Sequence, residues 1–128
     1  MSLKDKLIIV TGGGSGIGQQ ITKDLISSGA IVAALGRNLN KLNSIETINT
    51  VNLHSFVCDI SIEEQVKSTF EEIIEKISLP YGLVNCAGIN PSRNKISDTE
   101  SKHWEETIAV NLTGTFNCIK HVVNPMKS

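Results

Sequence analysis

A run of glycines near the amino terminus has the residue types and the placement of a phosphate-binding loop. Thr11-Gly12-Gly13-Gly14-Ser15-Gly16-Ile17-Gly18 follows the apolar run Leu7–Val10, which predicts a buried strand, and leads into a helical pattern. Glycines permit left-handed backbone angles and let a phosphate approach without meeting a Cβ atom. At a strand-to-helix junction, backbone N–H groups also converge on an anion. We therefore interpret this segment as a site for a nucleotide phosphate rather than as a flexible turn.

The spacing within this loop excludes two common nucleotide motifs. The interval from Gly13 to Gly18 fits a P-loop, but Gln19-Gln20 follow, so the lysine and hydroxyl that a P-loop needs are both missing. The strict Gly-x-Gly-x-x-Gly fingerprint fails in every register. The loop instead has the pattern Thr-Gly-x-x-x-Gly-Ile-Gly.

Three further motifs follow the later predicted elements. Asp59-Ile60 comes after the third strand, Asn85-Cys86-Ala87-Gly88 closes the fourth, and Asn111 lies in Val110-Asn111-Leu112-Thr113-Gly114. With the glycine loop, these motifs resemble the short-chain dehydrogenase/reductase family, in the family's order and over essentially the whole chain. The resemblance implies a doubly wound, Rossmann-like fold that binds a nicotinamide dinucleotide.

The resemblance also implies particular binding roles. Asp59 would accept a hydrogen bond from the adenine amino group, and Ile60 would pack beside that ring. Cys86 replaces the family's second Asn, but a small residue fits there, and Gly88 still permits close approach of the cofactor. The residues that we expect to contact the dinucleotide are Gly12, Gly14, Ser15, Gly16, Ile17, Gly18, Arg37, Asp59, Ile60, Asn85, Ala87, Gly88 and Val110.

The segment after the second predicted strand favours NADP(H) over NAD(H). A carboxylate at this position would bind the ribose 2′-hydroxyl of NAD and repel a 2′-phosphate, but the sequence reads Gly36-Arg37-Asn38. The planar guanidinium of Arg37 offers several donors to a phosphate. Ser15 argues in the other direction, because many NADP-preferring relatives carry a basic residue at this position. The alternative is that Arg37 is an ordinary solvated charge.

The residues that would carry out the family's reaction are not found in this sequence. The family uses a serine, a tyrosine and a lysine four residues after the tyrosine, whereas the only tyrosine here is Tyr81, which Asn85 follows at that distance. Asn111 matches the asparagine of the family's catalytic tetrad and is its only member present. We expect the 128-residue chain to lack dehydrogenase activity.

Three functions remain in competition. The first is an NADP(H)-linked oxidoreductase of alcohols or ketones, represented by its cofactor-binding half. The second is a noncatalytic nucleotide-binding or interaction fragment that associates with full-length relatives. The third is a methyltransferase, but that class normally has an acid after the second strand, and Gly36-Arg37 argues against it.

The elements that must position these motifs alternate as βαβαβαβα. This order predicts a single α/β domain, 1–128, with a doubly wound parallel sheet of order 3-2-1-4 in three layers, ending before a fifth strand. The third helix would lie on the opposite face from the first two. Ser61 with Glu64, and Ser97 with Glu100, have capping-box spacing and predict two helix starts. The first helix, predicted from Gly16 to Ser28, would place Ile17, Ile21, Leu25 and Ile26 on one side.

Composition sets broad limits on partners. The net charge of −1 gives no reason to expect nucleic acid, and no apolar run is long enough for a membrane span. Cys58, Cys86 and Cys118 form no metal or disulfide pattern, so we expect a cytoplasmic protein with no metal, and we expect Cys86 and Cys118 to be buried and unreactive. His54, His103 and His121 also lack ligand spacing.

The last predicted helix carries more apolar residues than one covered face requires. Its stripe consists of Trp104, Ile108, Leu112, Phe116, Ile119, Val123 and Met126, and Trp104 is expected to pack. In relatives this helix commonly contributes to a subunit interface, which implies oligomerisation through Trp104–Met126. The fourth strand would leave one edge unpaired, so we expect the chain to be marginally stable, prone to association, or an incomplete sequence.

Overall fold

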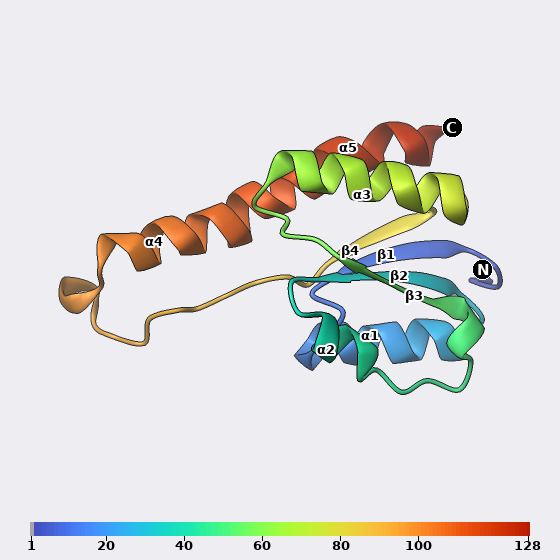
Figure 1. The fold of residues 1–128 in the computed structure, drawn as a ribbon, viewed down its shortest axis with the longest axis horizontal. Coiled ribbons are helices and arrows are strands. Elements are labelled where there is room, and N and C mark those ends of the chain that lie inside the picture. Colours follow the sequence, from blue (N-terminus) through green and yellow to red (C-terminus); the bar gives the residue numbers. More distant parts are fainter. Residues whose placement is uncertain (1) are drawn as a thin grey trace.

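The computed structural model describes residues 2–128 and has two helical layers around one parallel sheet (Figure 1). The strands lie in the order β3-β2-β1-β4, which confirms the predicted doubly wound order. The elements in chain order are β1 (Leu7–Thr11), α1 (Gly16–Ser27), β2 (Ile31–Gly36), α2 (Leu39–Asn43), β3 (Leu53–Val57), α3 (Glu63–Lys76), β4 (Gly82–Asn85), α4 (Ser101–Thr107) and α5 (Thr115–Lys127).

The helices divide between the two faces of the sheet as the crossovers predict. Helices α1 and α2 cover one face, and α3 with α5 covers the other (Figure 1). A π-helical segment, Ile108–Gly114, joins α4 to α5. The segment after β4 and α4 itself extend away from the sheet as an arm (Figure 1).

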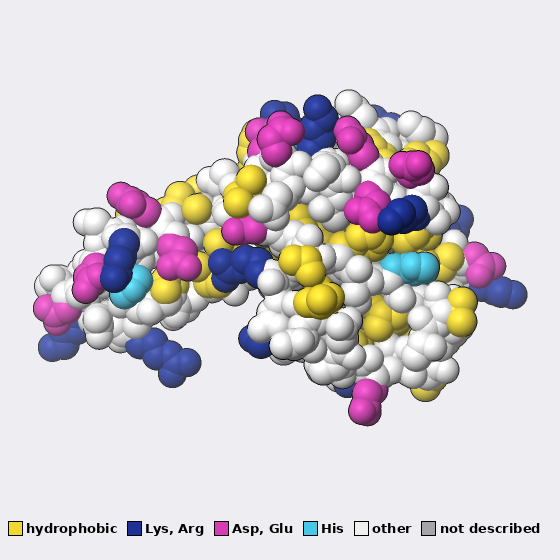
Figure 2. Space-filling view, viewed as in Figure 1, with side chains coloured by type: hydrophobic (Ala, Val, Ile, Leu, Met, Phe, Trp, Pro, Cys, Tyr) yellow, Lys and Arg dark blue, Asp and Glu magenta, His cyan; other side chains and the backbone are white. Residues whose placement is uncertain are grey.

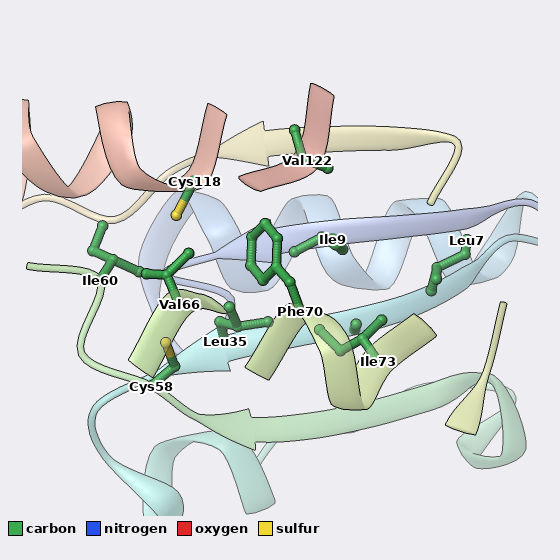
Figure 3. Packing of buried hydrophobic residues seen from close by; sticks show 11 residues of the cluster. Leu7, Ile9, Leu35, Cys58, Ile60, Val66, Phe70, Ile73, Cys118 and Val122 are labelled. Carbon is green, nitrogen blue, oxygen red and sulfur yellow. The ribbon is translucent and has the colours of Figure 1, made fainter. Parts of the chain in front are cut away.

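Strand β1 is the centre of the core because it is buried on both faces. Leu7 and Ile9 belong to the apolar cluster under α3 and α5, while Ile8 and Val10 belong to the cluster under α1 and α2. This alternation follows from the two-residue period of a strand. Figure 3 shows the first cluster, in which Phe70 of α3 projects toward Ile9. On its other side β4 pairs with no strand among residues 2–128, so that edge is unpaired as expected.

Two predicted helix starts differ from the structure. Helix α3 begins at Glu63 and not at Ser61, because the Ser61 hydroxyl and N–H both donate to the Asp59 carboxylate, at 2.6 and 3.0 Å. In a capping box Glu64 would accept from the Ser61 N–H, but Asp59 already accepts from that group. Ser97 lies in a short 3-10 turn, and α4 begins only at Ser101.

The buried face of α1 agrees with the prediction at Ile26 and differs from it at Ile17. Gly18, Thr22 and Ile26 are buried, whereas Ile17 is 77% exposed. A Cβ atom at Gly18 would overlap the carbonyl of Gly12, so only a glycine at this position lets α1 lie this close to the start of the glycine loop. The Thr22 hydroxyl donates to the Gly18 carbonyl at 2.9 Å, which satisfies its burial.

The stripe on the last helix is mostly exposed. Trp104 is 62% exposed, so the expectation that it packs is wrong, since α4 belongs to the arm that leaves the sheet. The face of α5 that contacts the sheet carries Asn117, Cys118 and Val122 instead. No helix within residues 2–128 has both the length and the apolarity needed to span a bilayer.

Candidate nucleotide-binding cleft

A cleft of about 550 Å³ opens at the carboxyl ends of the strands, beside the glycine loop. In a doubly wound sheet this edge, where the chain crosses from one face to the other, is the usual ligand site. Nine of the predicted contact residues line it: Gly12, Gly14, Ser15, Arg37, Asp59, Ile60, Ala87, Gly88 and Val110. These nine predicted residues therefore lie together in one cleft, to which the ends of all four strands contribute.

Gly12 fixes the path of the loop out of β1. Its φ of +65° lies in the left-handed region, and a Cβ atom there would lie 2.8 Å from both the N and Cα atoms of Ala87. Any side chain would therefore separate the glycine loop from the segment that follows β4. The close approach of Gly12 to Ala87 forms the floor of the cleft.

Thr11 reinforces the same junction with hydrogen bonds. Its hydroxyl oxygen accepts from the backbone N–H of Cys86 at 3.2 Å and of Ala87 at 3.1 Å. Thr11 is fully buried, and without it these two donors would lose their acceptor. This pair of bonds explains why a threonine precedes the glycines.

The loop offers a set of unpaired donors at the start of α1. Within residues 2–128, no acceptor is hydrogen-bonded to the backbone N–H groups of the segment from Gly14 to Gly18. Helix α1 is 12 residues long, so its amino terminus carries a substantial positive dipole end. A dinucleotide pyrophosphate fits this donor set, because it supplies several acceptor oxygens to one concave backbone surface.

Asp59 lies in the part of the cleft that is next to the carboxyl end of β3. One carboxylate oxygen, Oδ1, accepts from both the N–H and the hydroxyl of Ser61, while the N–H of Asp59 donates to the Gln65 side chain at 2.8 Å. The two bonds from Ser61 orient the carboxylate, the third fixes the backbone of Asp59, and the second carboxylate oxygen is left for another donor. The adjacent Ile60 is almost fully buried, so it can supply an apolar wall.

Cys58 also lines the cleft, next to Asp59. Burial raises the pKa of its thiol, an effect that a hydrogen bond with Thr69 partly offsets. Because the raised pKa keeps the thiol protonated, Cys58 is part of the apolar wall and not a nucleophile.

Asn111 holds the loop that follows β4. Its side-chain oxygen accepts from the N–H of Ile89 at 2.8 Å, and its side-chain nitrogen donates to the carbonyl of the same residue at 2.9 Å. The Asn111 carbonyl in turn accepts from the Thr115 hydroxyl at 2.9 Å. Asn111 itself does not line the cleft, but it fixes Ile89, which does.

Four other predicted contact residues lie outside the lining of the cleft. Gly16 and Ile17 face open space or solvent, Gly18 is buried under the loop, and Asn85 is exposed at the end of β4. Prediction from sequence missed several lining residues: Leu35, Gly36, Asn38, Lys41, Leu42, Cys58 and Ile89. Most of these neighbour a predicted residue in the chain. Lys41, four residues after Arg37, is the one that adds a charge.

This fold and cleft define a nucleotide-binding protein of the doubly wound α/β class. A family model described as short chain dehydrogenase matches residues 6–128. A 2,5-dichloro-2,5-cyclohexadiene-1,4-diol dehydrogenase of Sphingobium indicum is 32% identical over 124 residues, which cover 97% of this chain and 50% of the relative. The chain therefore belongs to the short-chain dehydrogenase family of oxidoreductases, and it spans about half the length of the curated relatives it matches.

Solved structures show the same similarity. The ligand-free aldohexose dehydrogenase of Thermoplasma acidophilum matches with a TM-score of 0.86 at 31% identity, over 98% of this chain and 46% of that chain. The structure of ElxO with NADP bound matches with a TM-score of 0.88 at 27% identity, over 96% of this chain and 51% of that chain. Both cover nearly the whole of the fold described above.

Proposed function

We propose that this chain binds NADP(H) as the cofactor-binding half of an oxidoreductase that acts on alcohols or ketones. The observation that carries the proposal is that Arg37 lines the cleft at the end of β2, where an NAD-binding relative would present an acid. The structural neighbour ElxO, solved with NADP bound, is consistent with this choice. The dehydrogenase relatives do not favour the alternative of a noncatalytic interaction fragment.

Each part of the dinucleotide has a group in the cleft that suits its chemistry. The unpaired N–H groups of Gly14 to Gly18 would hold the pyrophosphate, and the free oxygen of Asp59 would accept from the adenine amino group. Ala87, Gly88 and Val110 also line the cleft, and small or apolar residues such as these would leave room for the nicotinamide ring.

When bound, the cofactor would supply hydride transfer, and the residues of this chain would bind and orient it. Asn111 contributes by holding Ile89 in the cleft wall through two hydrogen bonds. Residues 1–128 contain no Tyr-x-x-x-Lys segment to relay a proton. These residues alone would therefore bind the dinucleotide without reducing a carbonyl.

Titration of the purified chain with NADPH and NADH, followed by nicotinamide fluorescence, tests the proposal. We expect binding with a preference for NADPH, and we expect Arg37→Glu to weaken NADPH selectively. No binding of either dinucleotide, or an equal loss for both in Arg37→Glu, would contradict it. Carbonyl reduction by the isolated chain would contradict the expected lack of activity.

We also propose that the chain self-associates through the surface of α4 and α5. Figure 2 shows apolar side chains along the arm, interleaved with charged ones. Trp104, Leu112 and Phe116 are each more than half exposed and follow one another along α4, the π-helical segment and α5. A run of exposed apolar side chains on one continuous helical segment suits an association surface. Sedimentation of wild type and Phe116→Glu tests this, since the substitution should shift the chain toward the monomer. A wild-type monomer at all concentrations would contradict it.

A cytoplasmic location fits the same proposal. The three cysteines are free, and two of them are buried in the core. Free thiols are typical of a reducing compartment.

A further inference from the structure

We infer that Lys41 is a second specificity-determining residue, and that its ammonium group binds the ribose 2′-phosphate together with Arg37. This inference rests on the proposed preference for NADP(H). It identifies a residue that the family motifs did not indicate, because Lys41 belongs to none of them.

Lys41 and Arg37 lie in the same part of the cleft. Both line it, together with Gly36, Asn38 and Leu42, which form the turn from β2 into α2. This turn is where the residue that reads the ribose 2′-position lies in dinucleotide-binding sheets. The two cations therefore face the position at which NADP and NAD differ.

Contacts on both sides of Lys41 fix its backbone. The Asn38 side chain accepts from the Lys41 N–H at 3.1 Å, and the next residue, Leu42, is fully buried against the sheet. A Cβ atom placed on Gly14 would lie 3.3 Å from the Lys41 Cβ, so the lysine stem begins directly against the glycine loop. The four-carbon stem therefore starts at the rim of the phosphate site rather than on a remote surface.

No salt bridge within residues 2–128 includes Arg37 or Lys41. Asp59, an acid that also lines the cleft, already accepts two hydrogen bonds from Ser61. Both cations line the same turn of the cleft, and a phosphate dianion bound there would accept charge-assisted hydrogen bonds from both.

The decisive experiment compares dinucleotides and variants by fluorescence titration. We expect Lys41→Met to weaken NADPH binding by about tenfold or more, the loss typical of one charge-assisted hydrogen bond, and to leave NADH binding unchanged. Lys67→Met removes the same charge from an exposed site on α3, outside the cleft, and should change neither affinity. Melting curves should show Lys41→Met folded, because Asn38 and Leu42 keep their contacts.

Two further measurements locate the contact. Adenosine 2′-monophosphate and adenosine 5′-monophosphate, used as competitors, should differ in affinity for wild type, and that difference should shrink in Lys41→Met. In the Arg37→Met background, the fold-change in NADPH affinity caused by Lys41→Met should differ from the fold-change in the wild-type background. Residues that bind one phosphate are energetically coupled.

The outcomes separate this inference from the proposed function. Preferential NADPH binding by wild type, with Lys41→Met no weaker than Lys67→Met, overturns the role of Lys41 and leaves the proposed function standing. An equal loss for NADPH and NADH also overturns it, since the lysine would then bind the pyrophosphate. A wild-type chain that prefers NADH, or binds neither, overturns both.

Discussion

The buried hydroxyl of Thr11 accepts hydrogen bonds from the backbone N–H groups of Ala87 and of its neighbour Cys86. Residues 76 positions apart are thereby joined beneath the cleft. The glycine loop and the segment after β4 consequently behave as one structural unit.

Replacement of Thr11 by valine should destabilise the protein by about 1–3 kcal/mol, because two partly buried donors lose their acceptor. The shape of the side chain is retained, so no large cavity forms. Urea unfolding of the variant measures the loss. Thr11→Ser keeps the oxygen and should lose less; equal stability of Thr11→Val and wild type would show that these bonds contribute little.

Gly114→Ala should destabilise the protein through overpacking. A Cβ atom at this position would lie 2.6 Å from Cγ1 and 2.7 Å from Cδ1 of Ile60. Displacing Ile60 should cost about 1–3 kcal/mol, which outweighs the gain of up to about 1 kcal/mol from the better helix propensity of alanine. Thermal unfolding provides the measurement. In the Ile60→Ala background the same substitution should be tolerated, and an unchanged cost there would exclude this contact as the cause.

The stability of the protein should depend on Glu63 in acid. Hydrogen bonds from Lys120 and then His121 lower the pKa of Glu63 from its ordinary value and link α3 to α5. A lowered pKa in the folded state means that the stabilisation is complete above the unfolded glutamate pKa of about 4.3, and is lost as the pH falls through the lower, folded value.

Urea unfolding at pH 7 and at pH values below 4 tests this dependence. Glu63→Gln should reduce stability at pH 7, by a small amount because the pair is partly exposed, and the difference from wild type should shrink in acid. Glu71→Gln, at an exposed position on α3, provides the control. A difference that stays constant with pH would contradict the prediction.

The three cysteines should differ in reactivity. Burial raises the pKa of Cys118 to about 12 and also raises that of Cys58, whereas Cys86 is only half-buried. Because the thiolate is the reactive form, iodoacetamide at pH 8 should modify Cys86 well before the other two. Mass spectrometry of the native and the urea-unfolded chain measures this, and native labelling of Cys118 at the rate of Cys86 would be inconsistent with its burial.

The sequence by itself determined the sheet order and most of the cleft. Apolar runs such as Leu7–Val10 mark strands that are buried on both faces, and the positive φ of Gly12 and the contact of Gly18 with the Gly12 carbonyl arise within the glycine loop itself. Such local constraints are visible in the order of residues. The sequence also placed Arg37 and Asp59 at strand ends, and the parallel topology brings strand ends to one edge.

Other features depended on competition between groups that only the tertiary structure brings together. The N–H and hydroxyl of Ser61 both donate to Asp59, so the N–H from which Glu64 would accept in a capping box is already bonded. Trp104 is exposed because α4 leaves the sheet, which its helical spacing could not reveal. Lys41 enters the cleft because the burial of Leu42 fixes α2 against the glycine loop. Periodicity indicates which residues share a face, but the partner of that face is decided by packing.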